Sequence, residues 1–142
     1  MIEAPALLDT DTLSLLSRGH VAVIGKARAY LEHHGRLTIS AVTVFERLRG
    51  YRAAIREAKP FEEQLAQFEL FVRTCIVLPV DAAAADVAAT IWSGLSAKRR
   101  RALGDILIAG TASARGLSLV TRNRKDFEPM TDLVDLRLTS WG

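Results

Sequence analysis

The sequence has 142 residues with a formal net charge of +3 and a pI near 9.4, and 49% of its residues are hydrophobic. This length suits one domain with a sizeable core, and the hydrophobic fraction excludes an intrinsically disordered chain. The longest apolar runs are far shorter than a membrane span, and the first residues lack the basic and apolar regions of a signal peptide.

Because Cys75 is the single cysteine, a disulfide within the chain is excluded. Its apolar neighbours favour a small side chain in the core. A chain without disulfides is typical of a reducing compartment, so we expect a cytoplasmic protein. The modest positive charge permits a polyanionic partner without requiring one. The clustering of the arginines along the chain is more informative than the total charge.

Short apolar runs alternate with segments of helical periodicity along the chain. Strands are predicted at residues 5–8, 37–39, 76–78, 117–120 and 134–138. Helices are predicted at residues 12–17, 21–34, 41–58, 60–73, 82–95 and 105–115, with polar loops at 96–101 and 121–126. This alternation predicts a single α/β domain over residues 1–142, in which a parallel sheet of about five strands lies between two layers of helices.

Three acids occur where strands end and helices begin. Asp9 directly follows the first strand, Glu46 lies in the first two turns of the helix after the second strand, and Asp105 begins the helix before the fourth strand. In open α/β sheets such positions meet at the carboxyl end of the strands, where ligands bind. Asp105 also precedes a nearly all-apolar helix, and buried acids are almost always paired or bound to a cation. The alternative is that these acids only stabilise helix N-termini, with Asp9 and Asp11 as caps.

Carboxylates that converge without a nearby His or Cys form a site of hard oxygen ligands. Such a site favours Mg²⁺, or Mn²⁺, over zinc. A bound Mg²⁺ keeps several waters, lowers the pKa of a water that can attack a phosphodiester, and a second ion can stabilise the leaving oxygen. The three acids therefore predict metal-dependent phosphodiester hydrolysis.

Four segments of the sequence resemble, in order and spacing, the signature segments of PIN-domain ribonucleases. They are residues 7–11 (LLDTD), 39–50 (ISAVTVFERLRG), 104–109 (GDILIA) and 119–127 (LVTRNRKDF). The resemblance is closest to the VapC-type toxins of bacterial toxin–antitoxin pairs and covers essentially the whole chain. It implies a three-layer α/β/α fold, Mg²⁺-dependent endoribonuclease activity, a cognate VapB-type antitoxin as inhibitor, and a homodimer. On the matching positions it implies that Asp9, Glu46 and Asp105 are metal-binding catalytic acids.

Two positions depart from the pattern of that family. Asp11 stands where relatives usually carry Asn, which adds negative charge near the site. The fourth acid of the family often falls in the segment after the fourth strand, where this chain has Asn123, with Asp126 three residues further on. Asn123 can orient a water, and Asp126 either replaces the fourth acid or caps the next turn. Thr121 is expected to hydrogen-bond a site carboxylate or a substrate phosphate.

Clustered arginines near the acids fit an RNA backbone, which binds through charge. We expect Arg99, Arg100 and Arg101, just before Asp105, to contact RNA, together with Arg122 and Arg124 beside Asn123. Arg52 and Arg56 fit a solvated helix face better.

An antitoxin segment is expected to dock as an amphipathic helix on the helices between residues 41 and 73. These helices carry four aromatic residues at helical spacing. We expect Tyr51 and Phe71 near the surface, and Phe61 and Phe68 in the core.

Two other functions are compatible with parts of the pattern. Asp9 and Asp11 after an apolar strand are similar to the motif of haloacid dehalogenase-type phosphatases, in which Asp9 would be the nucleophile and Lys98 a conceivable partner. A trapped aspartyl-phosphate would identify that chemistry. A PIN-like module that only binds RNA or protein is the second alternative. Metal-dependent cleavage that Asp105→Asn abolishes would exclude it.

Overall fold

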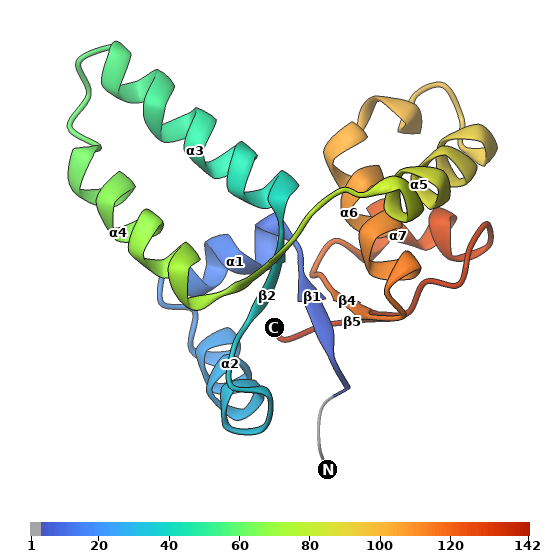
Figure 1. The fold of residues 1–142 in the computed structure, drawn as a ribbon, viewed down its shortest axis with the longest axis horizontal. Coiled ribbons are helices and arrows are strands. Elements are labelled where there is room, and N and C mark those ends of the chain that lie inside the picture. Colours follow the sequence, from blue (N-terminus) through green and yellow to red (C-terminus); the bar gives the residue numbers. More distant parts are fainter. Residues whose placement is uncertain (1–3) are drawn as a thin grey trace.

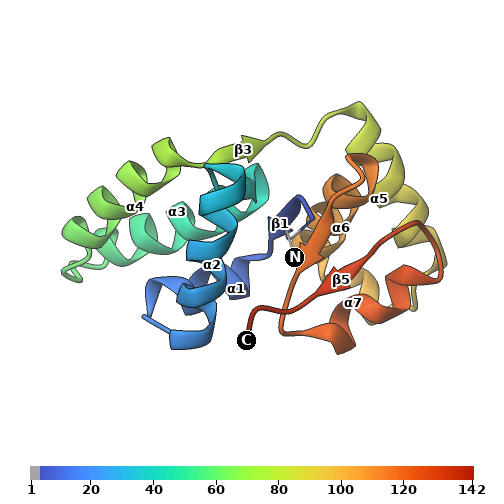
Figure 2. The same ribbon diagram turned by 90° about the horizontal axis from the view of Figure 1, so that it is seen from below.

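The computed structural model describes residues 4–142, and its strands form one parallel sheet (Figures 1 and 2). The order across the sheet is β3-β2-β1-β4-β5, and every neighbouring pair is parallel. The strands are β1 Ala6–Leu8, β2 Thr38–Ser40, β3 Ile76–Leu78, β4 Ser118–Val120 and β5 Leu138–Thr139. The first strand of the chain therefore lies in the middle of the sheet, and its carboxyl end opens toward the helices that follow.

Helices cover both faces of the sheet and complete a three-layer α/β/α arrangement (Figure 1). On one side are α1 Thr10–Ser17, α2 Val21–His34, α3 Ala41–Arg56 and α4 Glu62–Thr74; on the other are α5 Ala82–Gly94, α6 Leu103–Ala114 and α7 Arg124–Thr131. The short 3-10 turn η1 Arg99–Arg101 precedes α6. In Figure 1, α3 and α4 extend as a pair beyond the sheet. Between residues 4 and 142 no helix has both the length and the apolar content to cross a membrane.

Alternating strand residues divide the interior into two cores. Leu8 and Val120 belong to the core with α1, α2 and α4, whereas Leu7 and Leu119 belong to the core with α5, α6 and α7. Because successive strand residues point to opposite faces, a short and fully buried strand supplies both cores. Cys75 lies in the first core, as predicted, with 7% of its surface exposed.

Several predicted helix boundaries agree with the structure, and the capping residues explain where these helices begin or end. Ser40 accepts a hydrogen bond from the backbone N–H of Val42 at 3.0 Å, which caps α3. Gly35 ends α2 with a φ of 76°, a left-handed conformation that glycine adopts without a steric penalty.

The prediction of a loop at 121–126 was wrong in part, because α7 begins at Arg124. This helix is short, lacks a side-chain cap and contains Pro129, so its sequence carries weak helix signals. It is anchored instead by Phe127 and Met130, which lie one turn apart and are both buried in the second core. The predicted strand at 134–138 was also wrong in extent, since β5 begins only at Leu138.

Candidate active site at the carboxyl end of the sheet

Asp9 leaves the central strand and is almost completely buried, with 2% of its surface exposed. Its Oδ1 accepts a hydrogen bond from the backbone N–H of Thr12 at 2.7 Å, so Asp9 is the N-cap of α1. The hydroxyl of Thr121 also hydrogen-bonds to this carboxylate. Burial raises the pKa of Asp9, and the neighbouring charge of Asp11 adds to the increase. Asp9 therefore has the capping role that the sequence left open, and its carboxylate also lies within the acid cluster.

Glu46 is held between α1 and α6. The hydroxyl of Thr10 donates a hydrogen bond to Glu46 Oε1 at 2.8 Å and is 2.9 Å from the hydroxyl of Thr43. On the other side, a Cβ atom added to Gly104 would come within 2.8 Å of Glu46 Oε2. The absence of a side chain at residue 104 thus lets the start of α6 approach the carboxylate.

Asp105 lies in the first turn of α6 and is the most perturbed acid of the cluster. Burial, followed by the charges of Asp126, Asp9, Glu46 and Asp11 in decreasing order, raises its pKa from an ordinary value of 3.8 to about 6. Among residues 4–142, none of these acids forms an ion pair with a Lys, Arg or His. Among the described residues no direct ion pair therefore neutralises this negative charge, and this is the setting in which carboxylates bind a cation.

The acids form an electrostatic cluster, but they do not meet at one point. Within residues 4–142, no three Asp, Glu, His or Cys side chains are arranged so that they could hold a metal ion as they stand. The hydrogen bonds from Thr12 and Thr10 help to set the orientations of Asp9 and Glu46, respectively. The meeting of Asp9, Glu46 and Asp105 at one ion stays a prediction.

Asn123 and Asp126 have different positions at the edge of the cluster. Asn123 donates from Nδ2 to Asp11 Oδ2 at 2.7 Å, and its backbone N–H donates to the Thr121 hydroxyl at 2.9 Å. Asp126 lies in the first turn of α7, and its charge makes the largest contribution of the four acids to the raised pKa of Asp105. Asn123 therefore orients Asp11, while α7 brings the charge of Asp126 close to Asp105.

The predicted RNA-binding arginines differ in how much of each side chain is already engaged. Arg100 donates to the carbonyl oxygens of Trp92 and Ser93 at 2.9 and 3.0 Å and stacks on the Trp92 ring at 4.1 Å, which caps the C-terminus of α5. Arg99 donates to the Lys125 carbonyl at 3.2 Å.

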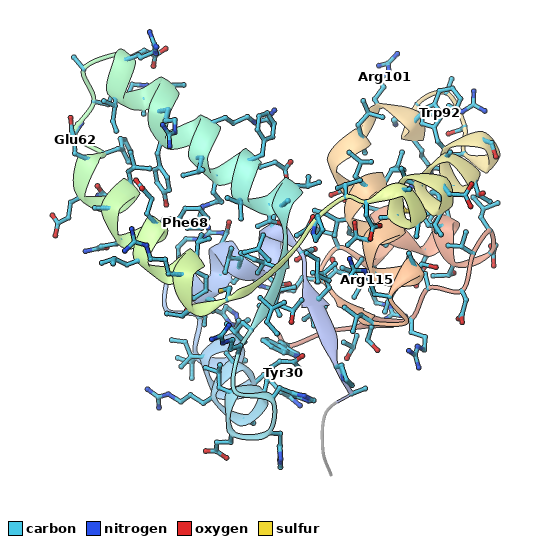
Figure 3. The ribbon with its side chains drawn as sticks, in the orientation of Figure 1. Tyr30, Glu62, Phe68, Trp92, Arg101 and Arg115 are labelled. Carbon is cyan, nitrogen blue, oxygen red and sulfur yellow. The ribbon has the colours of Figure 1, made fainter. Side chains whose placement is uncertain are left out.

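The remaining predicted arginines lie on the surface. Arg124 pairs with Glu128 at 3.4 Å on α7, while Arg101 and Arg122 are exposed. Figure 3 shows Arg101 extending outward from the turn before α6. Arg101 also lines a groove of about 650 Å³ that includes Glu46 and Asp105. Arg101 and Arg49 both line this groove, and Arg99 lines a neighbouring cavity with Asp105 and Asp126, so these three arginines lie beside the acids.

The same groove presents apolar side chains that the sequence analysis did not single out. Phe45 is 60% exposed and Leu103 is 58% exposed, and the Arg49 guanidinium lies 5.3 Å from the centre of the Phe45 ring. Thr10, Thr43 and Gly104 were likewise missed as supports of Glu46. Thr43 lies one turn before Glu46, and that spacing was the available signal.

Sequence and structure comparisons match this arrangement to known proteins. A family model described as PIN domain matches residues 6–131. The tRNA(fMet)-specific endonuclease VapC of Shigella flexneri is 41% identical over 112 residues, which cover 78% of this chain and 79% of that protein. Ribonuclease VapC1 of Rickettsia felis is 32% identical over 136 residues, 94% of this chain and 96% of that one.

A solved structure is similar over almost the same length. The crystal structure of DNA-bound VapBC from Salmonella typhimurium contains a chain with a TM-score of 0.78 and 26% identity, over 99% of this chain and 100% of that chain. The matches extend over the elements that carry Asp9, Glu46, Asp105 and Asp126.

Proposed function

The chain belongs to the PIN-domain family and is a VapC-type toxin endoribonuclease, and on that premise we propose that Asp9, Glu46 and Asp105 hold the divalent metal ion with which it hydrolyses RNA. The observation that carries this proposal is the gathering of carboxylates around Asp105 without a direct ion pair in the described residues, and burial together with their charges raises the pKa of Asp105 to about 6. An all-carboxylate donor set favours Mg²⁺, with Mn²⁺ as a substitute. When bound, the ion supplies a water of lowered pKa and stabilises charge on the phosphodiester.

The other residues of the site position these ligands. Thr10 orients the Glu46 carboxylate, Thr121 orients that of Asp9, and Asn123 orients that of Asp11. Asp126 is assigned the place of the fourth acid, because its charge acts directly on Asp105. Arg101, in the acid groove, and the exposed Arg122, next to Asn123 in the chain, are assigned to the RNA backbone.

Two partners follow from the family. The Salmonella relative was solved as a VapBC complex, and we assign this chain a cognate VapB-type antitoxin as its inhibitor. The homodimer that the resemblance implies is assigned to the face that exposes Phe45 and Leu103, because large exposed apolar side chains are typical of interaction surfaces. A single domain over 1–142 and a cytoplasmic location remain part of the proposal, and the buried Cys75 is compatible with that location.

The match to the PIN-domain model over residues 6–131 replaces the phosphatase interpretation of Asp9. The non-catalytic module is the alternative that an experiment must exclude. Labelled RNA is incubated with the purified chain in Mg²⁺, in Mn²⁺ and in EDTA, and cleavage is expected only with a metal. Asp105→Asn should abolish it, while Asp86→Asn, at an exposed acid on α5, should cleave like the native chain. Cleavage in EDTA, or by Asp105→Asn, would refute the proposed site.

A further inference from the structure

A second cleft lies between α1, α3 and α4, away from the acids. Its volume is about 690 Å³, and no Asp or Glu of residues 4–142 lines it. Its walls include Tyr51, Phe61, Phe68 and Phe71. Figure 3 shows Phe68 on α4 facing the space between α3 and α1. The prediction that Phe61 is a core residue was wrong, since it is 36% exposed, whereas Phe68 is buried as expected. The cleft thus has an aromatic wall beside polar side chains such as Gln64 and Gln67, and its described lining carries no negative charge.

Arg47 brings an unbalanced positive charge to this cleft. Its guanidinium carbon lies 5.5 Å from the centre of the Tyr51 ring and 5.0 Å from that of Phe68. Nη2 donates to the Tyr51 hydroxyl at 2.7 Å, and within residues 4–142 this is the only hydrogen bond of the guanidinium. Nη1 is buried without a partner. Burial of a polar group that lacks a partner is unfavourable, and aromatic rings compensate a cation only in part.

We propose that this cleft binds an acidic residue of the antitoxin, whose carboxylate pairs with Arg47. The inference rests on the proposed function, because it names the chemistry of the partner assigned there. The occupant is one amphipathic helix that carries an Asp or Glu between apolar side chains. The apolar groups pack on the aromatic walls, and the carboxylate receives the N–H donors of the guanidinium, whose planar fork suits a carboxylate.

The surroundings of Arg47 favour a carboxylate over an RNA phosphate. The guanidinium is flanked by two rings, so the group that reaches it must bring apolar surface with its charge. A phosphate in an RNA strand is flanked by polar sugars and phosphates. Arg18 also lines the cleft, which strengthens the preference for a negative partner. Arg47 therefore acts as a specificity residue, which selects an antitoxin with an acid at the matching position.

The test measures antitoxin binding and RNA cleavage separately. The full-length cognate VapB-type antitoxin is titrated calorimetrically into the native chain and into Arg47→Met, Arg47→Lys and Arg52→Met. Arg47→Met should bind about tenfold or more weakly, because the partner carboxylate is then buried without a counter-charge. The affinity of Arg47→Lys for the antitoxin should lie between those of the native chain and Arg47→Met, since lysine keeps the positive charge but lacks the planar guanidinium. Arg52→Met, at an exposed arginine of α3, should stay within about threefold of the native chain.

Without antitoxin, all these variants should cleave RNA like the native chain, which separates this inference from the catalytic proposal. Substituting each Asp and Glu of the antitoxin helix by Ala should reveal one position whose effect disappears in Arg47→Met, as expected for a direct pair. The inference would be overturned if Arg47→Met bound the antitoxin as tightly as the native chain does, or if the native chain did not bind it. Slower RNA cleavage by Arg47→Met with unchanged antitoxin affinity would assign Arg47 to RNA instead.

Discussion

The Glu46 carboxylate occupies the space that a side chain at Gly104 would need, since an added Cβ would approach its Oε2 to 2.8 Å. The two residues come from α3 and α6, so this contact sets how closely the two helices approach beside the acid cluster. The neighbour that would have to move is the flexible end of a side chain rather than backbone. A substitution at residue 104 should therefore affect the position of the carboxylate more than the fold.

Gly104→Ala should lower RNA cleavage while leaving stability nearly unchanged. The added methyl group pushes the Glu46 carboxylate away from its place, and a misplacement of about 1 Å can reduce activity by about a hundredfold. The measurements are the initial cleavage rate and the thermal midpoint. Gly50→Ala is the control, because nothing lies within 4 Å of an added Cβ there. Equal activity of the two variants would show that the position of Glu46 does not limit the reaction.

The raised pKa of Asp105 predicts that stability falls as pH rises. The folded pKa is about 6 and the ordinary value is 3.8, so between these values the folded chain holds the proton more tightly than the unfolded chain. The contribution of Asp105 to the free energy of unfolding is therefore most favourable below pH 4. It is lost as the pH rises to about 6, and above that pH it no longer changes.

Asp105→Asn should remove this dependence and keep or raise the melting temperature at neutral pH without added metal. Thermal unfolding of both chains from pH 4 to pH 8 measures it. A marked loss of stability in the variant at pH 7 would instead make Asp105 a helix-stabilising acid.

Metal binding should compete with protons at the cluster. The pKa values of Asp105 and Asp9 are both raised, so Mn²⁺ must displace a proton at lower pH and should bind more weakly at pH 5.5 than at pH 7.5. Calorimetric titration in buffers with different ionisation enthalpies measures the number of protons released. Asp105→Asn should lose most of the heat of binding. If Mn²⁺ bound with the same affinity at pH 5.5 and at pH 7.5, the ion would bind away from these acids.

The aromatic wall of the second cleft should contribute to antitoxin affinity. Tyr51 and Phe71 are both half-buried and line the cleft, so changing them together to Ser removes apolar surface on two sides. The expected result is weaker inhibition of RNA cleavage, measured by titrating the antitoxin at a fixed concentration of the chain. Circular dichroism must show that the double variant is folded. If a folded double variant is inhibited like the native chain, the antitoxin docks elsewhere.

The apolar wall of the acid groove should control self-association. Phe45 and Leu103 are large, apolar and more than half exposed. Changing both to Ser should shift the chain from dimer to monomer in analytical ultracentrifugation, because the buried apolar area would be lost. The exposed pair Leu31→Ser and Val21→Ser on α2 provides a control with similar chemistry at another face. A dimer that persists in the first variant would place the interface elsewhere.

The α/β order, and the positions of the three acids at strand ends and helix starts, could be predicted because their signals are local. Apolar runs followed by Asp9 or preceded by Asp105 are visible within a few residues. The supports of Glu46 were not predictable in this way, because Thr10 and Gly104 approach it only through tertiary packing. The role of Asp126 required α7, whose sequence lacks a cap and contains a proline. Likewise, nothing around Arg100 in the sequence shows that its donors are taken by the end of α5.

The middle position of the first strand has a consequence for the synthesis of the chain. Asp9 leaves β1, but β1 obtains its neighbour β4 only when residues 118–120 have been made, and Asp126 follows later still. Translation adds about 5–20 residues per second, so the nascent chain spends several seconds with its acids apart. A chain released by premature termination before residue 118 lacks β4 beside the central strand and also lacks Asp126. Incomplete products of this gene therefore lack the complete acid cluster, which is assembled only near the end of synthesis.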